Sequence, residues 1–226
     1  EIRLSLVGSE MCIRDSYNLH THSLEHACTG NAFYNYSYPE ELPCDLPFHF
    51  SLSLHPWDLL QEKLDSQLEW FYSHLSDSRL VAIGETGFDK LKGPQFQVQL
   101  FVFKTLARIS QEQNLPLIIH NVRSSSELIA LKHQLKADNP WIIHGFRGKR
   151  ELAKDLIRHG FYLSFGIHYQ AAALEAVPLD RLFLETDTSD TPIATLYEQI
   201  AADYQIPVNQ LDEIISQNIN SLFFKR

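Results

Sequence analysis

The sequence is poor in cysteine and methionine. Its three cysteines, Cys12, Cys28 and Cys44, are widely spaced and include no CxxC pair. This odd, scattered set argues against a disulfide framework and a cysteine zinc site, and it favours a reducing compartment, the cytoplasm. The single methionine, Met11, falls within residues 1–16, which show no clean hydrophobic period. We interpret residues 1–16 as a non-native or disordered leader without function.

The sequence also lacks long apolar runs and an excess of positive charge. No apolar run approaches the ~18 residues of a membrane-spanning helix, so we expect no membrane partner. Its 19 Lys and Arg against 28 Asp and Glu give a net charge of −9. That sign is wrong for a protein that tracks long nucleic acids by neutralising phosphates, so a phosphate-bearing substrate needs a local positive site. Nothing in the sequence indicates an obligate protein partner.

What the sequence does contain is an alternation of short apolar runs with longer stretches of helical period. With 226 residues and 44% hydrophobic content, one α/β domain over residues 17–226 is the simplest interpretation. Several apolar runs have no polar interruption, which is typical of strands buried on both faces of a parallel sheet. The expected strands cover residues 17–19, 32–36, 48–54, 80–83, 117–119, 141–143, 161–165 and 182–184.

Helices are expected between most of these strands. The helical periods cover residues 59–75, 95–113, 124–135, 149–159 and 191–204, and a last helix follows Pro207. Strand followed by helix implies parallel pairing, and eight strands in this order predict a closed (β/α)8 TIM barrel. The first unit is shortened, because a full helix hardly fits between Ser23 and Asn31.

Ionisable residues gather at the carboxyl ends of the predicted strands, where the loops of a parallel barrel meet. They lie in the stretches LHTH, SLHPW, AIGETGFD, LIIHNVR, WIIHGFRGK and LFLETD, which contain His20, His22, His55, Glu85, Asp89, His120, His144, Glu185 and Asp187. Taken singly, each has an ordinary explanation, since a lone histidine is more often a hydrogen-bonding residue than a ligand. Their joint occurrence at six of the eight predicted strand ends indicates a metal centre.

The residue types suit two cations held side by side. His20 and His22 lie two apart on an extended segment, so both rings share one face and can bind one ion. Glu85 can bridge two ions with its two oxygens. His120 and His144, from adjacent strands, can complete the ligands of the second ion.

Asp187 follows the strand that closes the barrel beside the first strand. It can reach the first ion and accept a proton from the attacking water, so Asp187 and Glu85 are the predicted catalytic residues. Two cations ~3.5–4 Å apart would act on a phosphoryl or acyl centre. Four histidines favour zinc by ligand type, and magnesium or manganese are the alternatives.

These stretches, together with GFYLSFG, resemble the TatD-type metal-dependent hydrolases of the amidohydrolase superfamily. The resemblance runs in the family's order from Tyr17 to the C-terminus. It implies a (β/α)8 barrel, two divalent metal ions and DNase activity, mostly 3′ to 5′ exonuclease action. The residues it implies are His20 and His22 on one metal, Glu85 between the metals, His120 and His144 on the other, Asp187 as ligand and general base, and His55 at the substrate phosphate.

The chain departs from the family pattern in two motifs. Asn18 stands where the family usually has Asp, so an amide replaces a carboxylate that would orient a ligand histidine. HGFRG stands where the family has HCFSG, so Arg147 replaces a serine. These departures leave the implied ligands in place and put the substrate in doubt.

Local positive charge follows the fifth and sixth strands. Arg123 and Arg147 are predicted to bind substrate phosphate, and Arg147 could do so in bidentate geometry. Lys149 and Arg150 lie next to them in the sequence, where they could equally be the solvated start of a helix. Trp57 could stack on a base at a frayed DNA end, or it could pack under its loop.

The predicted function is therefore two-metal phosphodiester hydrolysis on DNA ends or on a small phosphoester substrate. One alternative is a hydrolase of a small ester, amide or lactone, including aminoacyl esters, that uses the same site. The other is a non-catalytic metal-binding homologue. Arginines directed at the metal pair would favour phosphate, and an apolar pocket would favour the first alternative.

Overall fold

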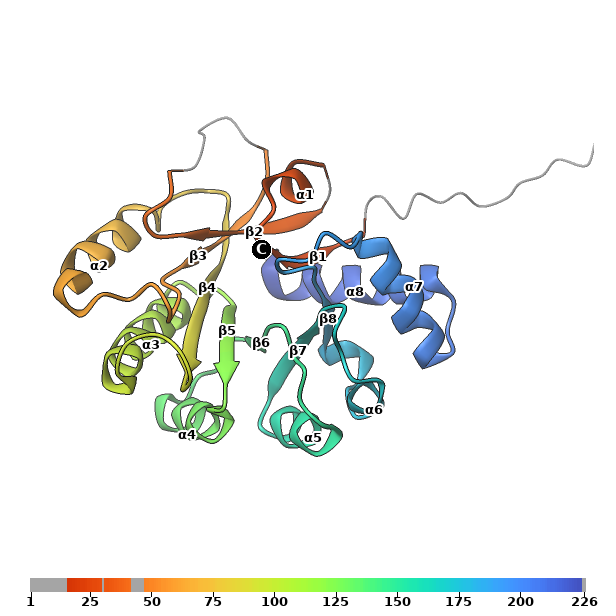
Figure 1. Ribbon diagram of the computed structural model, residues 1–226. Coiled ribbons are helices and arrows are strands. Elements are labelled where there is room, and N and C mark those ends of the chain that lie inside the picture. Colours follow the sequence, from red (N-terminus) through yellow and green to blue (C-terminus); the bar gives the residue numbers. More distant parts are fainter. Residues whose placement is uncertain (1–15, 30, 42–46, 225–226) are drawn as a thin grey trace, which may run out of the picture.

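The apolar runs of the sequence form an eight-stranded parallel sheet, in which each strand lies beside the next one along the chain (Figure 1). The computed structural model describes residues 16–29, 31–41 and 47–224. The strands are β1 (Asn18–Thr21), β2 (Ala32–Ser37), β3 (Phe50–Ser53), β4 (Leu80–Asp89), β5 (Leu117–Val122), β6 (Trp141–Ile143), β7 (Phe161–Phe165) and β8 (Leu182–Leu184). Each overlaps a predicted strand, and the predicted barrel class is confirmed.

The barrel closes between β1 and the residues just past β8. The backbone N–H of Asp187 donates to the carbonyl of His20 at 3.0 Å, and the N–H of His22 donates to the carbonyl of Asp187 at 3.1 Å. Thr21 and Asp187 form a parallel bridge at the same place. The closure brings a carboxylate from late in the chain to the histidines at its start.

Helices surround the strands, as Figure 1 shows. They are α1 (Leu24–Thr29), α2 (Leu64–Ser73), α3 (Phe96–Glu112), α4 (Ser125–Leu135), α5 (Arg150–Arg158), α6 (Ala171–Leu174), α7 (Ile193–Tyr204) and α8 (Val208–Phe223). Single 3-10 turns at Gln61–Lys63 and Leu179–Arg181 precede α2 and β8. Every predicted helix is present, and the shortness of α1 agrees with the shortened first unit. The sequence did not predict α6, a single turn that ends shortly before Pro178.

The core lies between the helices and the outer face of the strands. On α3, Phe103 and Ala107 are fully buried, and the Phe103 ring lies 4.8 Å from that of Phe88 on β4 and 5.3 Å from that of Trp141 on β6. Burial of a phenylalanine side chain stabilises a fold by about 1.5–3 kcal/mol. The three-and-four spacing of apolar residues on α3 therefore serves to dock this helix on the sheet.

Some expectations concern residues that lie outside the described ranges or at their ends. The predicted leader lies outside the described residues except for Ser16, and the single-domain interpretation of residues 17–226 stays a prediction. Cys28 is an exposed free thiol, whereas Cys12 and Cys44 lie outside the described ranges.

Within the described residues, no helix has the length and apolar character needed to cross a bilayer.

Candidate metal centre

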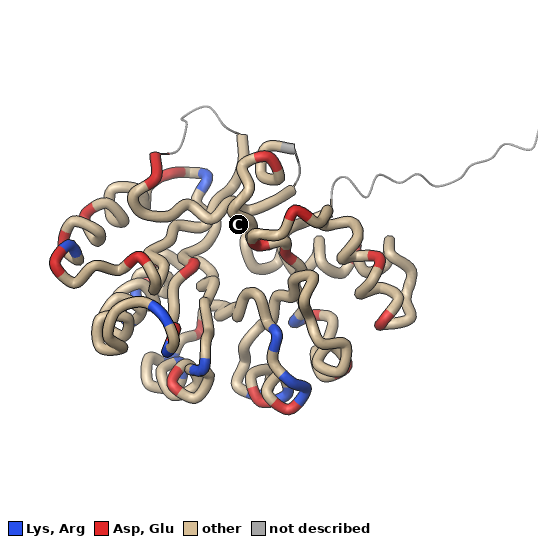
Figure 2. Tube along the Cα trace, in the orientation of Figure 1, with Lys and Arg blue, Asp and Glu red and all other residues tan. Residues whose placement is uncertain are grey.

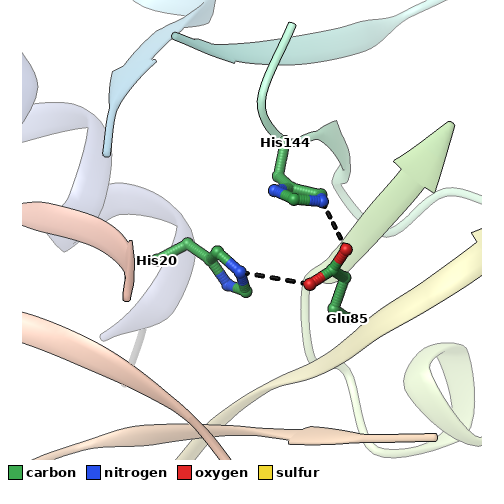
Figure 3. A group of neighbouring side chains, drawn as sticks. All are labelled: His20, Glu85 and His144. Atoms are coloured by element: carbon green, nitrogen blue, oxygen red, sulfur yellow. Dashed lines mark ion pairs between the residues drawn. The ribbon is translucent and has the colours of Figure 1, made fainter. Parts of the chain in front are cut away.

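The predicted metal ligands converge around Glu85 at the carboxyl ends of the strands. Glu85 lies on β4, His20 lies on β1 and His144 directly follows β6. In Figure 3 the rings of His20 and His144 approach opposite oxygens of the Glu85 carboxylate. One carboxylate therefore stands between ligands from opposite parts of the barrel.

Oxygen Oε2 of Glu85 faces the first group. It lies 3.2 Å from His20 Nε2 and 3.5 Å from His22 Nε2. Oδ1 of Asp187 lies 3.9 Å and 3.6 Å from the same two nitrogens. His20, His22 and Asp187 offer ligand atoms close enough to share one ion. We call them the Oε2 side.

Oxygen Oε1 of Glu85 faces the second group. It lies 2.7 Å from His120 Nδ1, 2.6 Å from His144 Nε2 and 3.1 Å from His55 Nε2. His120 and His144 are the Oε1 side. The side chains predicted as ligands thus lie together around Glu85, and His20, Glu85 and His144 also offer ligand atoms close to one another.

The backbone of Glu85 is held by neighbouring strands. Its N–H donates to Asn35 Oδ1 at 2.9 Å, and its carbonyl accepts from Ser53 Oγ at 2.7 Å. The preceding residue must be glycine, because Gly84 has a φ of +124° and a Cβ there would lie 2.2 Å from the carbonyl oxygen of Ile118. The peptide bond between Gly84 and Glu85 is cis. Buried amide and hydroxyl groups thus fix the carboxylate at the centre of the barrel mouth.

Two further carboxylates set which nitrogen of each Oε1-side histidine is free. Nε2 of His120 lies 3.3 Å from Asp89 Oδ2, and Nδ1 of His144 lies 3.1 Å from Glu185 Oε1. A carboxylate accepts, so these nitrogens carry the protons. If these rings shared a cation with Glu85 Oε1, His120 Nδ1 and His144 Nε2 would be the nitrogens that bind it. This is the arrangement by which proteins orient a ligand histidine.

His55 differs from these two histidines in its hydrogen bonds. Its Nδ1 accepts the backbone N–H of Trp57 at 3.2 Å, so the proton of the neutral ring lies on Nε2, which donates to Glu85 Oε1. A protonated nitrogen is no metal ligand. Although His55 lies within ligand distance of Glu85 and His120, we therefore interpret it as a hydrogen-bond donor at the edge of the site.

The residues present fit divalent cations. Both ring nitrogens of His20 are buried without a hydrogen-bond partner, which is rare for a buried polar group. A cation between His20 Nε2 and Glu85 Oε2 would satisfy one of them. The donor set of imidazole nitrogens and carboxylate oxygens suits zinc and, with fewer nitrogens used, manganese or magnesium.

Charge inside the site favours ionised groups. Burial raises the pKa of Glu85, but the charge of His144 and the close imidazoles of His120, His144 and His20 outweigh it, and the pKa lies well below its usual value. Burial lowers the pKa of His144, but Glu85 and Glu185 outweigh it and raise that pKa well above its usual value. The pKa of His22 is raised as well, by Glu85 and Asp187 against burial. The site is thus built around a fixed negative charge.

The side chain of Asn18, which departs from the family pattern, is hydrogen-bonded to Thr186. Its Nδ2 donates to Thr186 Oγ1 at 2.8 Å, and its Oδ1 accepts the N–H of Thr186 at 3.0 Å. The Thr186 hydroxyl in turn donates to Thr21 Oγ1 at 3.2 Å. Asn18 therefore joins β1 to the segment that carries Asp187.

Two cavities of about 550 Å³ each adjoin the cluster. Both are lined in part by Trp57, His120, His144, Arg147 and Asp187. The first also includes Arg123 and the apolar side chains of Ile143, Phe146 and Leu152, and the second includes His22, His55 and Glu85. The two predicted arginines thus lie beside the Oε1 side.

Lys149 and Arg150, the other two cations after β6, contribute less to the site than Arg123 and Arg147. Figure 2 shows Lys and Arg segments leading into α5, next to acidic ones. Arg150, the first residue of α5, pairs with Glu175 at 3.5 Å, and neither Lys149 nor Arg150 lines the two cavities. The alternative of a solvated helix start thus suits both of them.

Trp57 is partly exposed and already has neighbours. Its indole Nε1–H donates to Asp89 Oδ2 at 2.7 Å, and the ammonium of Lys92 lies 3.4 Å from the centre of its ring. Asp89 also accepts the N–H groups of Leu91 and Lys92 with Oδ1. One face of the indole is therefore covered by a cation, and Asp89 connects Trp57 to His120.

Sequence reasoning found Asp89 and Glu185 as strand-end groups but gave them no role. The structure places each behind a histidine, where it fixes the ring. The signal in the sequence was their position, four residues after Glu85 and two before Asp187. It was too weak to show which histidine each one reaches, because that depends on distances across the barrel.

The sequence and the fold were then compared with known proteins. The model of the family described as TatD related DNase matches residues 44–224. The metal-dependent hydrolase YabD of Bacillus subtilis, named as uncharacterized, is 28% identical over 196 residues, 76% of this chain and 76% of that protein. YjjV of Escherichia coli K12, named in the same way, is 30% identical over 159 residues, 65% of this chain and 60% of that protein.

Two crystal structures share the fold. That of YjjV, described as a TatD homologue from Escherichia coli K12, has a TM-score of 0.71 at 23% identity and covers 80% of this chain and 78% of its own. That of a TatD family hydrolase from Entamoeba histolytica has a TM-score of 0.69 at 16% identity and covers 92% and 85%. Both likenesses support the barrel architecture.

Proposed function

Since the chain belongs to the TatD related DNase family and is a metal-dependent hydrolase, we propose that it hydrolyses phosphodiester bonds at DNA ends with two divalent cations. The observation that carries this proposal is the division of ligands between the two oxygens of Glu85. His20, His22 and Asp187 would hold one cation with Oε2, and His120 and His144 would hold the other with Oε1. When bound, such a cation pair polarises a phosphoryl oxygen and lowers the pKa of water.

The protein's own residues then position the reactants. The Asp187 side chain is partly exposed and its Oδ1 lies at the Oε2 side, so it accepts the proton of the attacking water as the new oxygen–phosphorus bond forms. The bond from phosphorus to the leaving oxygen breaks, that oxygen takes up a proton from solvent, and Asp187 releases its own. His55 Nε2–H is available as a donor to a phosphoryl oxygen once a cation takes up Glu85 Oε1.

Arg123 and Arg147 supply the local positive charge that a polyanionic substrate needs. Both line the cavity that also contains His120 and His144. A guanidinium binds a phosphate with two parallel hydrogen bonds. This placement favours a phosphate substrate, whereas the apolar wall of Ile143 and Phe146 accommodates the sugar or base.

Nuclease assays test the reaction. We expect the metal-loaded protein to release nucleotides from single-stranded and duplex oligonucleotides with Mg²⁺, Mn²⁺ or Zn²⁺, and to lose this activity with a chelator. Asp187→Asn and His120→Ala should abolish release, while His133→Ala, a substitution on the exposed surface of α4, should leave it unchanged. Absence of turnover on every nucleic acid, with metal bound, would replace the proposal by the ester, amide or lactone hydrolase.

Salt dependence tests the part played by the arginines. For single strands, the slope of log K against log salt is ~0.7 for each phosphate that a cation neutralises. Arg123→Gln and Arg147→Gln should each lower that slope by about this amount. Lys154→Gln should not lower the slope, because Lys154 lies on the exposed face of α5 beside Glu151.

The cytoplasmic location and the absence of an obligate protein partner stay predictions.

A further inference from the structure

We propose that the end of the barrel opposite the metal centre contains a second binding site, for a small phosphate-bearing molecule. A cavity of about 490 Å³ opens there, beside the amino ends of β6, β7 and β8. Lys132 of α4 and Arg181, the residue before β8, both line it. A cavity of this volume is in the range of small-molecule sites.

Aromatic rings hold the two cations at the cavity. The Lys132 ammonium lies 5.1 Å from the ring centre of Trp141 and 5.5 Å from that of Phe161. The Arg181 guanidinium lies 4.5 Å from the ring centre of Tyr162. Cation–π contacts restrict where the charged groups can go. The two cations are therefore preorganised around the opening and cannot turn freely into solvent.

Two carboxylates accompany them, Asp138, which also lines the cavity, and Asp180. Arg181 Nε lies 4.0 Å from Asp180, a side chain that is 76% exposed, and Lys132 forms no close ion pair with any described residue. Burial lowers the pKa of Lys132 to about 8 against the charge of Asp138, and the charge of Arg181 adds a smaller effect in the same direction as burial. An anion bound to both cations would favour the charged form of Lys132.

A polar side chain on the cavity wall also has unused capacity. Asn139 lines the cavity and is 6% exposed. Its Nδ2 donates to the carbonyl of Leu115 at 2.9 Å, whereas its Oδ1 is buried without a partner. The wall of the cavity is thus polar beside the two cations, which suits the oxygens of a phosphate group.

Lys132 has a structural role as well, since its ammonium donates to the carbonyl of Ala137 at 3.3 Å, just after α4. That contact accounts for one lysine near a helix end, where cations are favoured. It gives no reason for a second cation, Arg181, to face the same cavity. The pair, with the cavity between its members, is what indicates a ligand.

Tryptophan signals give a local test, because the three tryptophans of the chain occupy different places. Trp141 lies under Lys132, Trp57 lies at the metal centre and Trp70 lies on α2. In a titration of the metal-loaded, ¹⁵N-labelled protein with inorganic phosphate, we expect the indole signal of Trp141 to shift with saturation. The Trp57 signal reports phosphate at the metal centre separately, and Trp70 serves as the unchanged reference.

Variants decide whether the cations cause the shift. Lys132→Met keeps the aliphatic stem over the aromatic rings, and we expect it to weaken phosphate binding at Trp141 roughly tenfold or more, as loss of a charged hydrogen bond does. Arg181→Gln should have the same effect, and Lys132→Arg should retain binding. Calorimetry at pH 8 should detect proton uptake in the wild type and none in Lys132→Met. The proposal would be overturned by a Trp141 signal that does not shift with phosphate. Equal affinities in the wild type, Lys132→Met, Arg181→Gln and Lys132→Arg would also overturn it.

A nucleoside monophosphate serves as the second probe. Tighter binding than inorganic phosphate at Trp141 would show that the site also recognises the organic part of the ligand, and equal binding would assign it to the phosphate group alone. Nuclease activity of Lys132→Met should equal that of the wild type, because Lys132 lies at the other end of the barrel. Failure of this proposal therefore leaves the proposed function untouched.

Discussion

The two sides of the Glu85 carboxylate are built differently. On the Oε1 side, His120 and His144 are each fixed by a carboxylate on the far nitrogen of the ring. On the Oε2 side, His20 has no hydrogen-bond partner at either nitrogen, and the side chain of His22 is 36% exposed. One side is therefore preorganised by the protein, whereas the other depends on a cation to order it.

This difference bears on how the two cations would be held. A preorganised histidine loses little conformational freedom when it binds a metal, so the Oε1 side should bind its cation more tightly. The Oε2 side, which includes the partly exposed Asp187, should exchange its cation more readily and contains the proposed general base. The comparison therefore predicts two unequal metal affinities.

The largest effect is expected at the residue that both sides share. Glu85→Gln removes the negative charge that both cations need, so we expect both metals to be lost and activity to fall by more than about 10²-fold, beyond the effect of an orienting residue. Metal content by mass spectrometry and nuclease rates measure this. Glu198→Gln, on the exposed face of α7, is the matched control. Retention of two metals in Glu85→Gln would show that the two sides do not share the charge of Glu85.

An effect on one side only is expected from the orienting carboxylates. In Asp89→Asn the amide faces two donors, His120 Nε2–H and the indole N–H of Trp57, and the orientation of His120 is lost. We expect the affinity of the tighter metal to fall about 10- to 100-fold, with the weaker one unchanged. Glu185→Gln keeps an acceptor for His144 and for the N–H of Gly145, so its effect should be smaller.

Calorimetric titration with Zn²⁺ separates the two affinities. Equal weakening of both metal affinities in Asp89→Asn would show that the two sides act as one unit. It would contradict the predicted difference between them. Glu127→Gln serves as the control, because Glu127 is an acidic residue paired with Lys90 on the outer surface.

Strands and ligands could be predicted from the sequence for the same physical reason. Apolar runs such as LIIH and WIIH have to be buried on both faces, and the first polar residue after such a run emerges at the barrel mouth. This located Glu85, His120 and His144 without any distance information. The family resemblance then divided the ligands between two metals.

Properties that depend on contacts across the barrel could not be predicted. The hydrogen bonds between Asn18 and Thr186 join residues 168 positions apart, and no local pattern predicts them. The proton position on His120 follows from Asp89, a partner on another strand. The cation pair of Lys132 and Arg181 is likewise formed by residues far apart in sequence that only barrel closure brings together.

Acid should weaken metal binding, most clearly on the Oε1 side. In the metal-free protein, Glu85 and Glu185 outweigh burial and raise the pKa of His144, so a cation has to displace a proton there. Below that pKa, affinity should fall about tenfold for each unit of pH. Stability of the metal-free protein should change in the opposite sense. The protonated histidine stabilises the fold below its unfolded pKa, and this contribution is lost as the pH rises through the raised value.

Competition with a chelator between pH 6 and 8, with urea unfolding of the metal-free protein, measures both trends. His144→Gln should flatten the pH dependence of stability. A metal affinity independent of pH in the wild type would contradict a protonated His144 in the empty site.

The smallest effect is expected at Asn18, because it supports the site from outside both sides of Glu85. Asn18→Asp keeps an acceptor for the N–H of Thr186 but removes the donor to its hydroxyl, whose proton must then turn away from Thr21. The net loss of one hydrogen bond should lower the free energy of unfolding by about 1 kcal/mol. Nuclease activity should change by less than about fivefold, since the altered hydrogen bond is to Thr186, which is not a predicted ligand.

Urea unfolding and metal titration of Asn18→Asp, with Asn18→Ala as the more disruptive control, distinguish two roles for this position. Asn18→Ala removes both hydrogen bonds to Thr186 and should cost about 2 kcal/mol or more. If aspartate instead tightens metal binding tenfold, its carboxylate orients a ligand histidine, as the family pattern implies. The Oε2 side would then be the preorganised side in relatives that have Asp at this position, and the asymmetry described here would be particular to this chain.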